Sequence, residues 1–308
     1  MLDIISIGEC MVELFSDQPM ATTTAFQRSF GGDTLNVLVA AARLGASTGY
    51  VTRVGRDAFG AYLLDAWRKE GIDASHARQA DGFTGLYFIS VLQGGQREFT
   101  YYRRGSAAST ITPGDISPAY VKTARVVHLS GITQALSPTC REATLSVARL
   151  AREAGVLVSY DPNLRPALWP LSEARDAFWE VLPYVDIALP SAPEELRVLL
   201  GTESPEEAVH ALWARGVKTV VVKLGKDGAL VGADGALTRA PAYQAGQVVD
   251  TSGAGDALDG AFLYGITHGM SPVEAARLGC VAAGLKVCER GTARAMPHRA
   301  QVMEALEK

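Results

Sequence analysis

The densest group of residues able to do chemistry lies near residue 250, where two aspartates flank a run of small residues. The run reads Asp250-Thr251-Ser252-Gly253-Ala254-Gly255-Asp256. Small residues let a backbone turn approach a ligand closely. A helix is expected from residue 255 to 268, so its free N–H groups and the positive end of its dipole would point at this turn. The pattern predicts an anion-binding loop.

Asp256 would lie in the first turn of that helix, beside the bound anion. A carboxylate in this place suits a general base that takes a proton from an attacking hydroxyl. The competing interpretation is an ordinary glycine-rich turn in which Asp256 only caps the helix. The presence of Asp250 and Thr251 at this spacing favours the functional interpretation.

Two other phosphate-binding devices can be excluded. A Walker loop needs a glycine five residues before Gly-Lys and a Ser or Thr after it, whereas Gly225-Lys226 has Val220 and Asp227 at those places. A dinucleotide fingerprint should follow the first strand, where only Gly8 stands. The main sequence evidence for an oxidoreductase is therefore missing.

Strands that alternate with helices would position these residues. Apolar, β-branched runs predict strands at 3–7, 49–54, 126–130, 156–160, 186–189 and 218–224. Helices are expected between them, and the last two are expected at 255–268 and 271–288. In the helix that follows Gly32, Asp33 or Thr34 can be the cap. Such alternation predicts a mostly parallel sheet covered on both faces, and no linker divides the chain, so we expect one domain, 1–308.

The segment 84–103 interrupts this alternation of strands and helices. Leu86, Phe88 and Ser90 alternate with Tyr87 and Ile89, a turn is expected at 93–96, and a second extended run follows. The pattern predicts a β-hairpin in a small separate sheet.

Composition limits the class of protein. The 308 residues carry 29 Lys and Arg against 33 Asp and Glu, a net charge of −4, and are 48% hydrophobic. These values predict a folded globular protein. They argue against a nucleic-acid partner, which would require a strongly basic face, but they do not bear on small anionic substrates.

The cysteines, the histidines and the N-terminus point to a soluble cytoplasmic protein. Four scattered cysteines without a C-x-x-C pair indicate reduced thiols. The five histidines lack ligand spacing, so no structural zinc is expected. No basic leader is present, and no uncharged apolar stretch approaches the about 18 residues of a membrane span. We expect no membrane partner.

These motifs resemble those of a known family. Residues 250–256 resemble the D-T-x-G-A-G-D signature of the ribokinase-like (PfkB) carbohydrate kinases, and residues 31–36 resemble their N-terminal glycine-rich sugar-binding motif. Order, spacing and length agree over essentially the whole chain. The resemblance implies a three-layer α/β/α domain with a mostly parallel central sheet, and a small β-sheet lid built by residues 9–32 and 83–106.

The resemblance implies ATP-dependent phosphorylation of a sugar hydroxyl. Asp256 would be the base, and the amides of Gly253, Ala254 and Gly255 would stabilise the transferred phosphoryl group. Mg²⁺ would bridge the phosphates, with Glu194 acting on it indirectly, through water. The nucleotide would be bound by Asn163, Ser191, Lys223, Gly225, Gly228, Gly253 and Gly255. This chain departs from the family at residue 191, where Asn is usual.

Within the family, shorter segments resemble those of the kinases of 2-keto-3-deoxygluconate, which implies transfer to the C6 hydroxyl. These segments are 8–11, 31–36, 84–87, 101–103, 129–132 and 161–165. An arginine fork formed by Arg103 and Arg165 would match the carboxylate of such a substrate, and Arg104 is an alternative to Arg103. The implied substrate residues are Gly32, Asn36, Tyr87, Tyr101, Arg103, Ile132, Arg165 and Asp256.

Other functions remain open. Fructokinase, or another neutral-sugar kinase, would not need the arginine fork. Thr292 stands where some 2-keto-3-deoxygluconate kinases have an aspartate. A non-catalytic sugar-binding protein on this scaffold is less consistent with an intact Asp256. The expected partners are a small sugar acid and ATP, and an exposed lid sheet favours a homo-oligomer, either a dimer or an assembly of dimers.

Overall fold

The computed structural model describes residues 1–91 and 97–307. It contains a large sheet of nine strands in the order β13-β12-β11-β10-β9-β8-β1-β4-β5. All neighbouring pairs are parallel except β11 with β12 and β12 with β13. Their bounds are β1 (Leu2–Ile7), β4 (Thr48–Gly55), β5 (Ala77–Ala80), β8 (Ala124–Ser130), β9 (Leu157–Asp161), β10 (Ile187–Ala188), β11 (Thr219–Lys223), β12 (Ala229–Ala233) and β13 (Ala236–Ala240).

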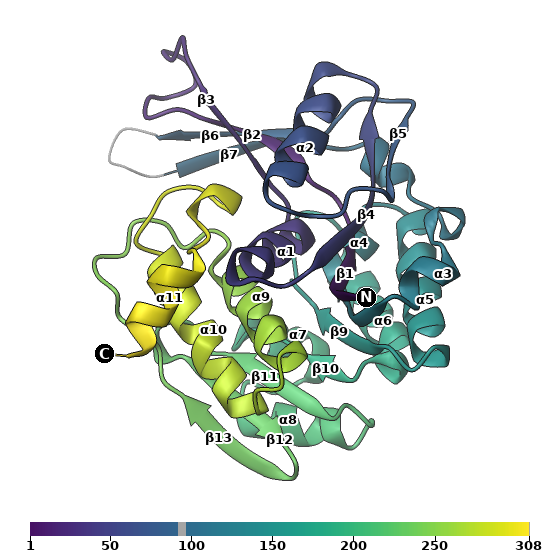
Figure 1. Ribbon diagram of the computed structural model, residues 1–308, viewed down its shortest axis with the longest axis vertical. Coiled ribbons are helices and arrows are strands. Elements are labelled where there is room, and N and C mark those ends of the chain that lie inside the picture. Colours follow the sequence, from purple (N-terminus) through teal and green to yellow (C-terminus); the bar gives the residue numbers. More distant parts are fainter. Residues whose placement is uncertain (92–96, 308) are drawn as a thin grey trace.

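Helices cover both faces of the large sheet, which confirms the predicted three-layer fold (Figure 1). One apolar core packs α1, α2, α9, α10 and α11 on one face, and a second packs α3, α5, α6, α7 and α8 on the other. The helices are α1 (Asp33–Leu44), α2 (Ala58–Lys69), α3 (Pro118–Val121), α4 (Gly131–Ala135), α5 (Pro138–Glu153), α6 (Leu171–Val181), α7 (Glu194–Leu200), α8 (Pro205–Trp213), α9 (Ala254–Thr267), α10 (Pro272–Lys286) and α11 (Arg299–Leu306).

The helix that follows the small-residue run, α9, is the most buried of the described helices. From Asp256 to Gly265 every residue of α9 is buried. A helix that is apolar all round has to be covered on all sides. It lies beside α10 in Figure 1, and both contribute to the same core.

A second sheet has the order β3-β2-β6-β7 and projects from the large sheet at the upper left of Figure 1. Its strands are β2 (Met11–Phe15), β3 (Gln27–Gly31), β6 (Leu86–Val91) and β7 (Arg97–Tyr102). β6 and β7 pair antiparallel as the predicted hairpin requires, and β2 pairs with β6 in parallel. The turn predicted at 93–96 lies outside the described residues.

No helix within 1–91 and 97–307 is long and apolar enough to cross a membrane.

Candidate active site

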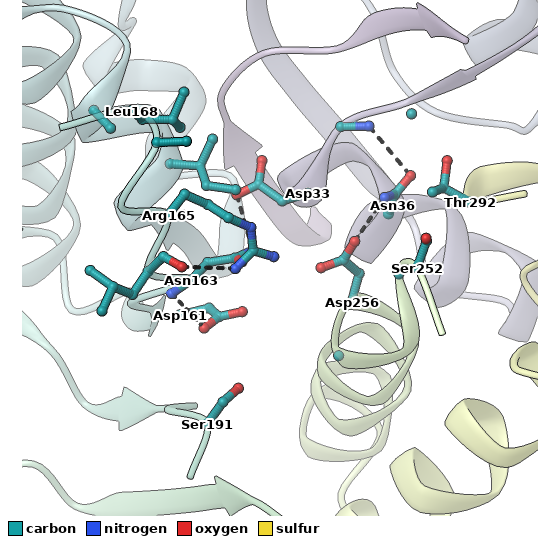
Figure 2. A pocket seen from close by; sticks show the side chains of 18 of the residues that line it. Asp33, Asn36, Asp161, Asn163, Arg165, Leu168, Ser191, Ser252, Asp256 and Thr292 are labelled. Atoms are coloured by element: carbon teal, nitrogen blue, oxygen red, sulfur yellow. Dashed lines mark hydrogen bonds between the residues drawn. The ribbon is translucent and has the colours of Figure 1, made fainter. Parts of the chain in front are cut away.

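A cavity of about 990 Å³ opens where the parallel strands of the large sheet end and the small sheet begins. Strands β1, β8, β9, β10 and β11 all contribute residues to it at or just beyond their carboxyl ends. Ligands bind at this edge in open α/β sheets. The small sheet supplies Met11, Gly31, Tyr87, Phe99 and Tyr101 to the other side of the cavity. The start of α9 forms a third wall (Figure 2).

Most residues predicted from the sequence line this one cavity. They are Gly32, Asn36, Tyr87, Tyr101, Arg103, Ile132, Asn163, Arg165, Ser191, Glu194, Lys223, Gly253, Gly255 and Asp256. The alternative arginine, Arg104, lines it as well. Ala254, Gly225 and Gly228 are not among its lining residues. The proposed nucleotide contacts of these two glycines stay predictions.

The start of α9 has the features of an anion site. Its N-cap, Gly253, has a left-handed φ of 77° and no side-chain cap. The first N–H groups of an α-helix have no partner within the helix. No side chain caps α9 in the described structure, and the N–H of Ala254 donates to the carbonyl oxygen of Thr251 at 3.2 Å. The N–H groups that follow, at Gly255 and Asp256, and the positive helix end are available to an anion in the cavity.

Asp256 projects from the first turn of α9 into the cavity (Figure 2). Asn36 Nδ2 donates a hydrogen bond of 2.7 Å to Asp256 Oδ2. Burial, reinforced by the nearby Asp33 carboxylate, raises the pKa of Asp256 to about 7, although the hydrogen bond from Asn36 works in the opposite direction. A carboxylate with this pKa can accept a proton near neutral pH and release it again.

The expectation that Asp33 or Thr34 caps α1 is wrong. The N-cap is Gly32, and no side-chain cap is present. The Asp33 carboxylate instead accepts hydrogen bonds from Ser130 Oγ and from Asn163 Nδ2, the latter at 3.4 Å. It thus lies in the cavity across from Asp256 (Figure 2). Sequence reasoning missed this role because a capping preference explained the same residue.

Glu9 is a second site residue that sequence reasoning missed. Its side chain is buried, Oε1 accepts a 2.8 Å hydrogen bond from Ser106 Oγ, and Oε2 lies 2.7 Å from Arg103 Nη2. Arg103 therefore already has a carboxylate partner. Arg165 is exposed, and its Nη1 donates to the carbonyl oxygen of Leu164 at 3.0 Å. Arg165 takes part in none of the ion pairs among the described residues.

Tyr87 and Tyr101 face the same side of the small sheet, as alternation predicts. They pair directly across β6 and β7, and their rings stack with centroids 5.6 Å apart. The Tyr87 hydroxyl donates a 2.6 Å hydrogen bond to Glu13 Oε2, which Thr292 Oγ1 also contacts at 3.3 Å. Thr292 therefore stands in the cavity wall, next to an acidic side chain from β2.

Buried charged side chains lie at the end of the cavity next to β9, β10 and β11. Lys223 Nζ lies 2.8 Å from Asp161 and 3.1 Å from Asp259. Burial lowers the pKa of Lys223, but these carboxylates outweigh it and raise the pKa above its ordinary value. The buried Glu195 accepts 2.7 Å hydrogen bonds from the N–H groups of Leu164 and Ser191. Glu195 therefore joins the loops after β9 and β10.

Glu194 is exposed at the start of α7 and lines the cavity. Within the described ranges, no group of three or more His, Cys, Asp or Glu side chains could hold a metal ion. A divalent cation here would have to take most of its ligands from phosphate oxygens and water, which suits Mg²⁺. An exposed carboxylate such as Glu194 is compatible with a contact through water.

Comparison with known proteins defines the class. Residues 1–299 match the family described as pfkB family carbohydrate kinase. The chain is 34% identical to 2-dehydro-3-deoxygluconokinase of Thermoproteus tenax, covering 100% of this chain and 95% of that protein. It is 33% identical to fructokinase-1 of Oryza sativa subsp. japonica, covering 99% and 97%. The crystal structure of fructokinase with bound ATP from Xylella fastidiosa superposes with a TM-score of 0.88 at 27% identity, covering 99% and 98%.

The fold, the cavity and these relatives together define a phosphotransferase that acts on a sugar hydroxyl. The chain belongs to the pfkB family of carbohydrate kinases.

Proposed function

We propose that this kinase transfers the γ-phosphoryl group of ATP to the C6 hydroxyl of 2-keto-3-deoxygluconate, giving 2-keto-3-deoxy-6-phosphogluconate. The observation that carries the substrate assignment is the exposed guanidinium of Arg165, which lies in the cavity across from Asp256 (Figure 2). A sugar acid could place its carboxylate there and its far hydroxyl at Asp256. Burial raises the pKa of Tyr101, and the positive charges of Arg103 and Arg165 both counteract this shift, which supports placing the two guanidinium groups at the same end of the cavity.

In the proposed reaction, Asp256 accepts the proton of the C6 hydroxyl while the oxygen attacks the γ-phosphorus. The bond between that phosphorus and the bridging oxygen breaks, and ADP leaves. Asn36 holds one oxygen of Asp256 through its 2.7 Å hydrogen bond, which leaves the other oxygen for the sugar. The N–H groups at the start of α9 stabilise the charge on the transferred group.

Mg²⁺ would neutralise charge on the phosphates, and Glu194 is our candidate for a contact to it through water. Lys223, Asn163 and Ser191 line the part of the cavity assigned to the nucleotide. We expect the reaction in the cytoplasm, where all four free thiols would stay reduced.

Phosphorylation of fructose is the second candidate. Arg103 is already paired with Glu9, and the small-sheet side of the cavity also carries Glu13, bonded to Tyr87. Acidic acceptors suit the hydroxyl groups of a neutral sugar, whereas they repel a carboxylate. The similarity to a plant fructokinase points in the same direction.

A phosphoryl-transfer assay that measures ADP release decides between the two. We expect kcat/KM to be at least tenfold higher for 2-keto-3-deoxygluconate than for fructose, about 1.4 kcal/mol of transition-state stabilisation. Arg165→Met should raise KM for the sugar acid and leave KM for fructose almost unchanged. Arg175→Met, at an exposed position of α6, is the control. Equal kcat/KM for the two sugars would contradict the carboxylate assignment.

A further inference from the structure

Lys286 is the last residue of α10, and its relative exposure is 0%. Its Nζ donates a 2.8 Å hydrogen bond to the carbonyl oxygen of Asp250, the residue directly before the anion loop, which we define as 251–255. Taking an ammonium group out of water costs several kcal/mol, on the order found for buried ions, unless polar partners compensate. A buried lysine at this position therefore needs an explanation, because an apolar residue would fill the same space without that cost.

The surroundings of Lys286 compensate for burial. The end of α10 carries the negative pole of the helix dipole, which favours a cation. The charged groups that act on the ammonium are the carboxylates of Asp250, Asp256 and Glu13 and the guanidinium of Arg97. Burial lowers the pKa of Lys286, and the carboxylates counteract this shift.

The residue that Lys286 contacts organises the entry to the anion loop. The Asp250 carboxylate accepts hydrogen bonds from the N–H groups of Ser252 at 3.0 Å and Gly291 at 2.9 Å, and it pairs with Arg97 of the small sheet. The N–H groups of Val249 and Asp250 both donate to the carbonyl oxygen of Val287, at 2.7 and 3.0 Å. The end of α10 is thus joined to this segment by backbone bonds as well as by the ammonium.

The orientation of one peptide group links Lys286 to the cavity. The carbonyl of Asp250 and the N–H of Thr251 belong to the same planar peptide unit and, in the trans form, point in opposite directions. Because the ammonium holds the carbonyl on the side of α10, the N–H of Thr251 is directed away from α10. Thr251 lines the cavity. The ammonium group beside the carbonyl oxygen also polarises the peptide and makes its N–H a stronger donor.

We propose that Lys286 is a built-in cation that positions the anion loop for phosphoryl transfer. The proposal rests on the proposed role of this loop in the kinase reaction. Lys286 does not line the cavity, so it is a positioning residue that acts through Asp250. Its charge should affect kcat, since the loop stabilises the transferred group, and should leave binding of the sugar at the opposite wall nearly unchanged.

The test replaces Lys286 by Met, which has similar length and no charge, and by Ala, which leaves space. We expect kcat to fall about 10- to 100-fold in both, by analogy with the loss of one donor to a transition-state anion, while KM for the sugar changes less than about twofold. In Lys286→Ala, ammonium or methylammonium chloride should restore part of kcat, and tetramethylammonium chloride at equal ionic strength should not. Wild-type kcat should be the same in all three salts.

Leu278→Ala is the matched control, because Leu278 is buried in the same helix and carries no charge. It should lower the melting temperature without lowering kcat, measured well below that temperature. Wild-type kcat in Lys286→Met, or a kcat in Lys286→Ala that ammonium does not raise, would overturn the proposal. If Asp256→Asn kept normal turnover, the proposed function itself would fail, so the two failures are distinguishable.

Discussion

Asp256 combines three conditions that a general base for a sugar hydroxyl requires. It lies at the uncapped start of α9, its orientation is fixed by Asn36, and its pKa is raised to about 7. The raised pKa has an energetic consequence, since the ionised form is disfavoured in the folded protein by about 1.4 kcal/mol for each unit of the shift.

Asp256→Asn should remove the base and keep the shape of the side chain. We expect kcat to fall by about 10²- to 10⁴-fold. The folded protein retains a proton between pH 3.8, the ordinary pKa, and about 7, where the unfolded chain has lost it. The free energy of unfolding of the wild type therefore decreases as pH rises through this window. The Asn variant does not share this loss, so it should melt at a higher temperature than the wild type at pH 8.

Kinetics at fixed temperature and melting curves at pH 4 and pH 8 check both parts. The difference in melting temperature between variant and wild type should be larger at pH 8. A variant that is less stable than the wild type at pH 8 would contradict the raised pKa.

The pH dependence of turnover reports the same group. With Asp256 as the base, kcat/KM for the sugar should rise with pH, with a midpoint near 7. Asp33→Asn removes a negative charge that raises the pKa of Asp256, so the midpoint should move to lower pH. Asp65→Asn, on the exposed face of α2, is the control and should leave the midpoint unchanged. An unshifted midpoint in Asp33→Asn would show that Asp33 does not act on the base.

At the scale of elements, the junction between the anion loop and α9 depends on one backbone conformation. Gly253 has a φ of 77°, and a Cβ added there would lie 3.3 Å from Met296 Cε. A left-handed φ costs a residue with a side chain roughly 1–2 kcal/mol. Glycine at this position therefore lets the chain turn into the helix while the N–H groups of Gly255 and Asp256 stay open to the cavity.

Gly253→Ala should lower both stability, by about 1–2 kcal/mol, and kcat, by about tenfold or more. Gly201→Ala is a matched control, because Gly201 has the same φ of 77°, caps α7, and has open space where the Cβ would lie. It should lose similar stability in denaturant unfolding and keep wild-type kcat. Equal effects of the two substitutions on kcat would refute a special role for the loop geometry.

At the scale of the whole molecule, the cavity exists only because a second sheet stands over the edge of the first. The inner face of the small sheet presents Tyr87 and Tyr101 to the cavity, and the opposite face carries Phe88 and Tyr102, whose rings meet edge to face at 5.9 Å. Tyr102 is 57% exposed and lies on β7, at one edge of the four strands. An exposed aromatic edge of this kind favours pairing with another chain.

We therefore predict a dimer formed through the small sheet. Light scattering at micromolar concentration should give twice the 32.7 kDa of one chain, and Tyr102→Glu should shift the population towards the monomer. Arg68→Glu, on α2, is the control for a change of charge alone. A wild-type mass of one chain would contradict the prediction.

Local patterns in the sequence predicted the β-hairpin and six strands of the large sheet, but not β5, β12 and β13. Periodicity and turn residues act over a few positions, so these features are already encoded locally. The same holds for the alternation that puts Tyr87 and Tyr101 on one face. Most of the site residues predicted from the family motifs also line the cavity.

Only the tertiary structure decided how the charges pair. Glu9 is paired with Arg103, Asp33 accepts from Ser130, and Lys286 donates to the carbonyl of Asp250. These partners are separated by 36 to 97 residues in the chain, so no local pattern relates them. Burial and neighbouring charges then determine the pKa of Asp256, because both depend on groups that folding alone brings together.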